Sequence, residues 1–433
     1  MPETVPEPGR PDSSGRKSLW RDPDFLKIWT AQSTSNLGRM MSVLPLVAIL
    51  ALDARPYQMA IIGGASAAAG LAFGLIAGPW VDRTRRRLVL VATDLAQATS
   101  IASIAVAYFV FELHIEHLYV VAFTNGSLGI FNEVASRAYL PSLVDRNRLL
   151  EANSKLAASA AVVEQIGFSV GGFIAQLASA ISASVVQAIT FAVSGLLILA
   201  IRRPEPPPAS GSGDQENSIR RELIEGYRFI AGHQILRLVA TSSAVMAGAG
   251  GIIGGMITLF AITEIGFLPG PLGVIYGIGG LSSFVGAIYA ARVTRRLGVG
   301  PTMVMGTLVY GVIGFLIPLA PTQIWIATVF FVLPQILGDG FWIMREINEV
   351  SLQQAVTPEH LRGRVASALK VSEKLAILIG VSMAGLVAEL AGLRVALAMG
   401  FVIFLMGGLV LLHPAIRNLR NMPEEVAEAG TPA

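Results

Sequence analysis

The chain has 433 residues, of which 53% are hydrophobic and 14% are charged, and its formal net charge is +3. A soluble domain carries roughly 25% charged residues, so this composition is too poor in charge to cover a surface in water. The absence of cysteine excludes disulfides, thiol nucleophiles and zinc–thiolate sites. We therefore expect an all-α membrane protein.

Residues 1–24 open the chain with a polar segment rich in Pro, Glu, Ser, Gly and Arg. It has no apolar core, so it predicts a disordered cytosolic tail and not a cleavable signal peptide. Twelve apolar runs follow, each near the ~20 residues that cross a hydrocarbon core of ~30 Å. The predicted spans are 26–52, 57–81, 88–111, 117–140, 153–178 and 181–201, and then 236–263, 270–291, 301–320, 323–345, 366–391 and 393–413. They predict two six-helix bundles, over 25–201 and 236–413.

The stretch 202–235 between the two halves has the composition of a linker, with three consecutive prolines and a Gly-Ser-Gly run. Towards its end, Ile219, Leu223, Tyr227 and Ile230 recur at helical spacing beside three arginines. This pattern predicts a short amphipathic helix on the membrane surface. A soluble linker helix is the alternative. Residues 414–433 predict a second cytosolic tail.

Successive predicted loops alternate between many basic residues and few. One side holds the N-terminal tail, the arginine-containing loops and the residues after 413; the loop arginines fall in 83–87, 146–148, 202–228, 292–296 and 362–364. The loops of the other side hold only Arg55 and Arg394. Because basic loops remain on the cytoplasmic side, we expect both termini to be cytoplasmic, in a multi-pass protein of the inner cell membrane.

The two halves repeat each other weakly. Asp82–Arg87 follows the second predicted span, and Ala291–Arg296, which is also rich in arginine, follows the eighth. In the fifth and eleventh spans, Gly167, Gly171 and Gly172 are spaced as Gly380, Ala384 and Gly385 are. Duplication of six spans is a common transporter architecture, with the substrate path between the halves near mid-membrane.

The segment Gly78–Arg87 reads Gly-Pro-Trp-Val-Asp-Arg-Thr-Arg-Arg-Arg. It resembles the motif of the major facilitator superfamily between spans two and three, with Arg85 where many members have glycine. Other stretches resemble the drug and siderophore exporter branch, of the macrolide-efflux, enterobactin-exporter and transmembrane secretion effector types. They are Leu19–Arg21 with Ser35–Gly38, Leu140–Val144, Glu222–Ile230 and Pro358–Val365. The resemblance implies the major facilitator fold, with two pseudo-symmetric six-helix bundles.

The resemblance also implies that the first arginine-rich loop latches the halves together in the outward-open state. The gating residues carried over are Gly78, Asp82, Arg83, Arg86 and Arg87. A plain positive-inside anchor is the alternative. The second-half loops contribute Arg292, Arg295, Arg296, Arg362 and Arg364. Ala291 stands where Asp82 would fall, so a latch there would be weaker or built differently.

Ionisable residues inside spans are costly and usually functional. Glu164 lies eleven residues beyond Asn153, about 16 Å along a helix that rises ~1.5 Å per residue, and so near mid-membrane. Burial there would favour the protonated carboxyl, which makes Glu164 the first candidate for proton coupling. Structural pairing with a neighbouring arginine is the alternative. Asp339 in the tenth span is the second candidate.

Other charged residues fall in or near the spans. Glu133 and Arg137 lie one turn apart and can pair along the helix. Arg39 is predicted to lie near mid-membrane, where it needs a partner such as Glu133 or Glu164; it could also attract an anionic substrate. We expect Arg345, Glu346 and Glu349, like Lys370, Glu373 and Lys374, to form solvated or latch-facing clusters.

Gly167–Gly172 in the fifth span resembles the antiporter motif of the superfamily, with Phe168 in place of its proline. The main hypothesis is a proton-coupled exporter of drugs, siderophores or other amphipathic metabolites that works by alternating access. The alternatives are an importer or uniporter of a small organic anion, with Arg39 as its partner, and a non-transporting sensor or scaffold.

The sequence contains no phosphate-binding loop, no nucleophile–base arrangement and no cluster of histidines. It therefore indicates neither an enzyme nor a metal site. We expect no cofactor beyond the proton gradient. The expected partners are a small-molecule substrate and the lipid bilayer, with no nucleic acid, and we expect a monomer.

Overall fold

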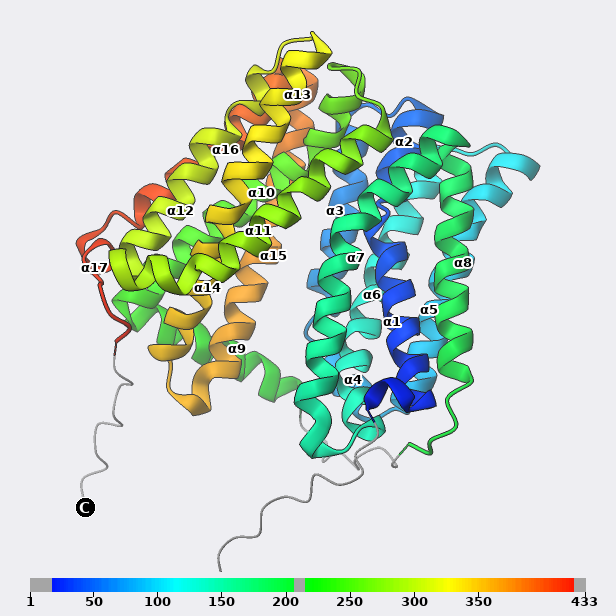
Figure 1. The fold of residues 1–433 in the computed structure, drawn as a ribbon, viewed down its shortest axis with the longest axis horizontal. Coiled ribbons are helices and arrows are strands. Elements are labelled where there is room, and N and C mark those ends of the chain that lie inside the picture. The colour runs from blue at the N-terminus through cyan, green and yellow to red at the C-terminus, as the bar shows by residue number, and fades with distance from the viewer. Residues whose placement is uncertain (1–17, 206–214, 424–433) are drawn as a thin grey trace, which may run out of the picture.

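The computed structural model describes residues 18–205 and 215–423, and within them the regular structure is helical, without strands. Ten of the described segments are long and apolar enough to cross a bilayer. Two more, Pro56–Asp82 and Ile115–Leu143, complete the first bundle; the former is interrupted and the latter is rich in polar residues. The predicted all-α fold with twelve spans in two bundles is confirmed by the order of the described helices, and Figure 1 shows the two bundles side by side.

The first half contains six spans. In chain order they are α1 with α2 (Pro23–Met40, Val43–Leu52), α3 with α4 (Pro56–Phe73, Ala77–Asp82), α5 (Arg86–Val110), α6 (Ile115–Leu143), α7 (Leu149–Leu177) and α8 (Ala180–Leu199). Two spans that we expected to be continuous are broken. Ser42, with a left-handed φ of 49°, separates α1 from α2, and residues 74–76 separate α3 from α4.

The second half follows the linker helix α9 (Gln215–Gly232). Its spans are α10 (Gln234–Thr263), α11 (Pro269–Leu297), α12 with the 3₁₀ turn η3 (Val299–Gly314, Ile317–Leu319), α13 with α14 (Ile324–Leu333, Asp339–Ala355), α15 (Arg362–Ala391) and α16 (Leu393–Val410). The π-helical turn η4 (Pro334–Gly338) joins α13 to α14. The tenth span therefore contains a π-helical turn that begins at a proline, and it continues ten residues beyond its predicted end at 345.

The structure corrects the predicted disorder of residues 18–24 and shows that part of the predicted C-terminal tail is folded. Residues 18–24 fold back as the turn η1 (Leu19–Arg21) and the start of α1, and Leu19 is buried. At the other end, the short helix α17 (Pro414–Arg417) and the residues after it pack on the start of α12, where Gly300 donates a backbone hydrogen bond of 2.9 Å to Leu419. Residues 1–17, 206–214 and 424–433, which include parts of both tails and of the linker, lie outside the described residues.

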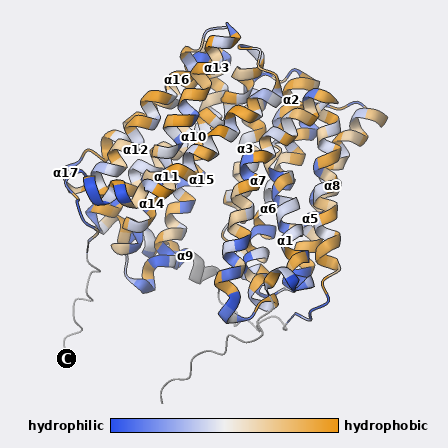
Figure 2. Ribbon diagram, in the orientation of Figure 1, coloured by the Kyte–Doolittle hydropathy of each residue, from blue (hydrophilic) through white to orange (hydrophobic). Residues whose placement is uncertain are grey.

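The two halves pack on each other through α7 against α11 and α3 against α15. We call the end of the molecule beside α9 the linker end, and the opposite end, where α3 and α11 begin, the far end. The halves meet at the far end and diverge toward the linker end (Figure 1). Hydrophilic residues gather around α4, α9 and α17, whereas the middle parts of the spans are largely apolar (Figure 2).

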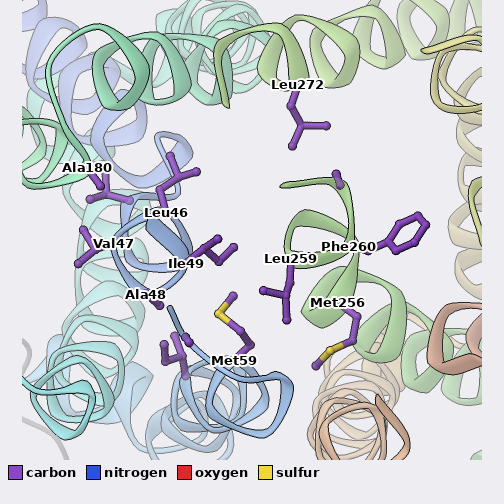
Figure 3. Packing of buried hydrophobic residues seen from close by; sticks show 14 of the residues in the cluster. Leu46, Val47, Ala48, Ile49, Met59, Ala180, Met256, Leu259, Phe260 and Leu272 are labelled. Carbon is purple, nitrogen blue, oxygen red and sulfur yellow. The ribbon is translucent and has the colours of Figure 1, made fainter. Parts of the chain in front are cut away.

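The hydrophobic cores follow the same division. At the far end, one core takes buried residues from both halves, such as Leu46, Ile49 and Met59 from the first and Leu259 and Leu272 from the second (Figure 3). Toward the linker end, each half has a separate core, one around α1, α5 and α6 and the other around α10, α14 and α15. Among the described residues, the core that takes side chains from both halves is the one at the far end.

The repeat seen in the sequence has a structural basis. Gly167 in α7 packs against Met40 of α1, and Gly380 in α15 packs against Gly248 of α10. In both cases the glycine lets the fifth span of its half approach the first span closely, as small residues do between membrane helices. The predicted correspondence between these spans is confirmed.

Candidate functional site

A cavity of about 1130 Å³ lies between the two halves. Its walls come from α1, α2, α3, α5, α6 and α8 of the first half and from α15 of the second. The charged residues of the lining are Arg39, Glu133, Arg137, Lys370, Glu373 and Lys374. Apolar side chains such as Leu44, Ile101 and Phe191 complete the wall. The cavity therefore offers both charges and apolar surface to a ligand.

Glu133 and Arg137 face this cavity from α6. Their side chains form an ion pair of 2.6 Å along one turn of the helix, and both are largely exposed. The predicted pairing is confirmed. Since an exposed pair of this kind contributes little stability, its charges remain available to a ligand.

Arg39 reaches the same cavity from the end of α1. Its guanidinium donates hydrogen bonds to Asn36, one turn back, and to Asn132 of α6 at 3.4 Å. Its hydrogen-bond partners are thus two amides, although Asp94 and Glu133 lie within electrostatic reach. The expectation that Arg39 pairs directly with Glu133 or Glu164 is wrong, because its guanidinium donates its hydrogen bonds to the side-chain amides of Asn36 and Asn132.

Sequence reasoning missed Asp94 in α5, which is 1% exposed. Its carboxylate accepts hydrogen bonds from Asn132 at 2.9 Å, from Ser194 of α8 at 2.5 Å and from Ser35 of α1 at 3.3 Å. Four spans of the first half therefore converge on one buried acid. The signal was present, because Asp94 is the only acidic residue in the predicted span 88–111.

A second cavity, of about 840 Å³, lies within the second half among α10, α12, α14, α15 and α16. Arg345 and Glu349 on its wall are 3% and 5% exposed and form an ion pair one turn apart. Both also hydrogen-bond to Ser243 of α10, and Arg345 stacks on the ring of Trp342 at 4.6 Å. Our expectation of a solvated or latch-facing cluster is wrong for these two residues, whereas Glu346 is exposed as expected.

Glu164 lies on an exposed face of α7. It is within electrostatic reach of Glu346 on α14, in the opposite half. The next residue, Gln165, packs against Gly277 and Gly280 of α11. The expected burial of Glu164 is wrong for this conformation, because position along a helix sets depth but not the face on which a side chain lies.

Asp339 begins α14 directly after the π-helical turn. Its carboxylate packs against Gly279 of α11 and lies within electrostatic reach of Tyr310 on α12. It is not among the residues that line the two cavities described above. The structure therefore brings Arg39, Glu133 and Arg137 together and places Glu164 and Asp339 elsewhere.

The first arginine-rich loop is organised by contacts within its own half. Asp82 is largely exposed and lies 3.7 Å from Arg86. Glu205, from the segment after α8, accepts hydrogen bonds from the backbone nitrogens of Arg86 and Arg87 at 2.7 and 3.2 Å. Arg87 in turn donates to the last carbonyl groups of α8, at Ile198 and Leu199.

The gating residues predicted for the second half form two groups. Arg292, Arg295 and Arg296 are exposed at the end of α11. At the start of α15, Arg364 forms an ion pair of 2.7 Å with Glu225 of α9, and Arg362 donates to the carbonyl of Thr357. The linker helix is therefore attached to α15, and Gly226 packs against the Arg364 backbone.

Two pseudo-symmetric six-helix bundles with a polar cavity between them define a transmembrane transport protein. The family model of the Major Facilitator Superfamily matches residues 28–381. The chain therefore belongs to the Major Facilitator Superfamily.

Curated relatives and solved structures agree with this assignment. The chain is 28% identical over 361 residues to the multidrug efflux pump Tap of Mycolicibacterium fortuitum, covering 80% of this chain and 84% of the pump. It is 21% identical over 417 residues to the MFS-type transporter YfiS of Bacillus subtilis strain 168, covering 94% and 97% of the two chains.

The crystal structure of the nucleoside transporter NupG superposes with a TM-score of 0.70 at 13% identity, covering 90% of this chain and 98% of that one. A bacterial homologue of the human lysosomal transporter Spinster, in an inward-facing and unoccupied conformation, gives 0.68 at 12% identity, covering 92% and 97%. At these identities the two structures establish the fold.

Proposed function

We propose that this protein is a secondary active transporter that exports drugs, siderophores or similar amphipathic molecules in exchange for protons. The observation that carries the proposal is the cavity of about 1130 Å³ between two halves that share an apolar core at the far end. A substrate path between repeats that rock about a central site is the usual arrangement of alternating access. Export is also the activity named for the relative Tap.

In this proposal the linker end faces the cytoplasm and both termini lie there, in the inner cell membrane. The arginines of the loops at α4–α5 and after α11, and those of α9, support this orientation through the positive-inside rule. The structure then represents the inward-facing state, in which an exporter loads its cargo. The similarity to the inward-facing Spinster homologue agrees with that assignment.

The proposed cargo follows from the cavity wall. Its volume suits a drug-sized molecule, and its combination of apolar and charged side chains suits an amphipathic one. The separate cavity beside Trp342, Tyr310 and Phe404 adds an aromatic surface in the second half. Binding would therefore draw on apolar contact, with one or two charges fixing the orientation.

Glu164 and Asp339 remain proposed coupling residues. Glu164 is supported by its position across from Glu346 in the other half, within electrostatic reach of that carboxylate. If it carries the proton, Glu164→Gln abolishes uphill transport and leaves substrate binding intact. Unchanged uphill transport in that variant removes Glu164 from the mechanism.

The loop from Gly78 to Arg87 is proposed to act as a latch in the opposite, outward-open state. In that state the linker ends of the two halves would approach, and Asp82 would meet a helix end of the second half. The exposure of Asp82 in the present structure supports this availability. Loss of export in Asp82→Ala, with normal expression, supports a latch in a transporter and argues against a non-transporting scaffold.

A second candidate function is import or uniport of a small organic anion. Four cationic side chains line the central cavity, Arg39, Arg137, Lys370 and Lys374, against the two carboxylates Glu133 and Glu373. The excess of positive charge favours an anionic group on the ligand. This function predicts accumulation in the direction opposite to export.

The decisive experiment is transport in everted membrane vesicles across a panel of dyes, antibiotics and siderophores, with and without an uncoupler. A proton-coupled exporter accumulates at least one compound inside these vesicles, and the uncoupler abolishes the accumulation. Accumulation that persists with the uncoupler, or uptake of an organic anion by right-side-out cells only, contradicts the proposal.

A further inference from the structure

Asp94 lies at the point where four spans of the first half meet, and it is not among the coupling residues proposed above. Its carboxylate accepts hydrogen bonds from Ser35 of α1, Asn132 of α6 and Ser194 of α8. Each of these side chains is at most 4% exposed. A buried carboxylate is costly unless hydrogen bonds satisfy it, so this arrangement holds a charge that the surrounding apolar spans do not favour.

A chain of hydrogen bonds connects this acid to the central cavity. Asn132 donates from its amide nitrogen to Asp94 and accepts, at its amide oxygen, from Arg39, which lines the cavity. Gln97, one turn after Asp94 in α5, also lines the cavity, and its buried amide nitrogen has no hydrogen-bond partner among the described residues. Gln97 therefore leaves one donor free at the wall of the cavity, one helical turn from Asp94.

We propose that Asp94 is a further proton-carrying residue of the first bundle, distinct from Glu164, loaded from the central cavity beside Gln97 and coupled to the ligand through Asn132 and Arg39. A hydronium ion in the cavity gives its proton to the Asp94 carboxylate and leaves as water. The neutral carboxyl then no longer attracts the Arg39 guanidinium, which becomes free to turn into the cavity. This inference rests on the proposed function as a proton-coupled transporter. It adds Asp94 to the residues to which that proposal assigns the coupling.

The groups around Asp94 are compatible with binding of a proton by its carboxylate and unfavourable for binding of a metal cation. Arg39 of α1 is the cation nearest to Asp94, Glu133 of α6 lies beyond it, and the sequence of α8 contains no charged residue. The hydroxyl and amide groups point their hydrogens at the carboxylate, whereas sodium would need their lone pairs. A neighbouring guanidinium would repel a metal ion as well.

A structural role is the competing explanation, since Asp94 joins four helices. Asp94→Asn separates the two roles, because asparagine keeps the shape and most hydrogen bonds of a protonated aspartate but takes up no proton. Infrared difference spectra of the purified protein between pH 9 and pH 5 detect the protonated carboxyl directly, without a ligand. We expect the parent and Glu164→Gln to share a carboxyl band that Asp94→Asn lacks.

Ser194→Ala provides a second variant in case Asp94→Asn does not fold. Removal of one donor weakens the charged form of Asp94, so the midpoint of the band moves to higher pH. If the band is present in Asp94→Asn and its midpoint is unmoved in Ser194→Ala, the proposal is overturned.

Transport in the same vesicles tests the coupling separately, with ethidium as the probe. Asp94→Asn is expected to reduce proton-driven ethidium accumulation to the level of vesicles without the protein, while gradient-independent ethidium exchange continues. Full uphill accumulation in Asp94→Asn overturns the role of Asp94. If the parent itself accumulates no ethidium but shows the Asp94 band, the proton site stands and the proposed export of this dye fails.

Discussion

Gly172 of α7 lies against the backbone carbonyl of Pro269, the first residue of α11 in the opposite half. The pseudo-symmetric contact joins Gly385 of α15 to Tyr57 and Ala60 at the start of α3. Neither glycine has room for a Cβ atom. These two contacts close the far end, and they occur at positions that the internal repeat relates to each other.

Gly172→Ala is therefore expected to disfavour closure of the far end. An added methyl group meets backbone on α11, and overpacking of this kind costs ~1–3 kcal/mol, which shifts a two-state equilibrium about 5- to 150-fold. Spin labels placed across the far end should report a larger population at long distance. Gly255→Ala is the matched control, because its added Cβ would lie 3.9 Å from Val381, at ordinary contact distance. Identical distance distributions in the parent and Gly172→Ala would contradict this account.

The buried pair Arg345–Glu349 predicts a large effect on stability. Removing one partner leaves an uncompensated buried charge, which typically costs ~3–5 kcal/mol. Arg345→Met should lower the midpoint of thermal unfolding in detergent, and the double variant Arg345→Met/Glu349→Gln should recover part of the loss. If the double variant is as unstable as the two single effects combined, the residues do not act as a pair.

Glu205 caps the N-terminus of α5 through the backbone nitrogens of Arg86 and Arg87. Loss of a capping side chain costs about 1 kcal/mol, and a carboxylate also interacts favourably with the helix dipole. Glu205→Ala should speed hydrogen exchange of the first turn of α5. Glu389→Ala, at an exposed position of α15, should leave that exchange unchanged. Equal exchange in the parent and Glu205→Ala would exclude the cap.

His233 predicts a pH dependence outside the membrane-spanning segments. Its ring accepts a hydrogen bond from the backbone nitrogen of Leu236 at the start of α10, and burial lowers its pKa below the usual value of about 6.5. The unfolded chain therefore takes up the proton first, and the free energy of unfolding falls as the pH drops through about 6.5. The fall ends below the folded-state pKa, where both states are protonated.

Thermal unfolding between pH 8 and pH 5 checks this prediction. His233→Asn keeps a good capping residue and removes the titrating ring, so its stability should fall less over this range. An equal fall in the parent and the variant would assign the pH dependence to other groups.

The spans, the repeat and the Glu133–Arg137 pair could be predicted because they depend on local patterns. Apolar length sets a span, glycine spacing sets a close approach, and residues four apart share a helix face. The break at Ser42 and the π-helical turn before Asp339 could not be predicted in the same way. They depend on packing between segments that are distant in sequence, as where Gly171 of α7 meets the backbone of Met41.

The candidate site was harder to predict, because sequence fixes the depth of a charge in the membrane but not the direction in which it points. Glu164 was expected to be buried and is exposed, whereas Arg345 and Glu349 were expected to be solvated and are buried. Asp94 met the same criterion that selected Glu164, an isolated acid inside a span. Its importance became visible only when Ser35, Asn132 and Ser194 were found around it.

The central claim is that the two halves rock about a shared cavity, and distances along the α7–α11 interface test it most directly. The chain has no cysteine, so pairs introduced at exposed positions carry spin labels at those sites alone. Leu150 with Leu297 reports the linker end, and Leu177 with Leu268 reports the far end. On addition of a transported compound or a change of pH, the first distance should shorten while the second lengthens. Two distances that stay fixed, or that change in the same direction, would contradict the account.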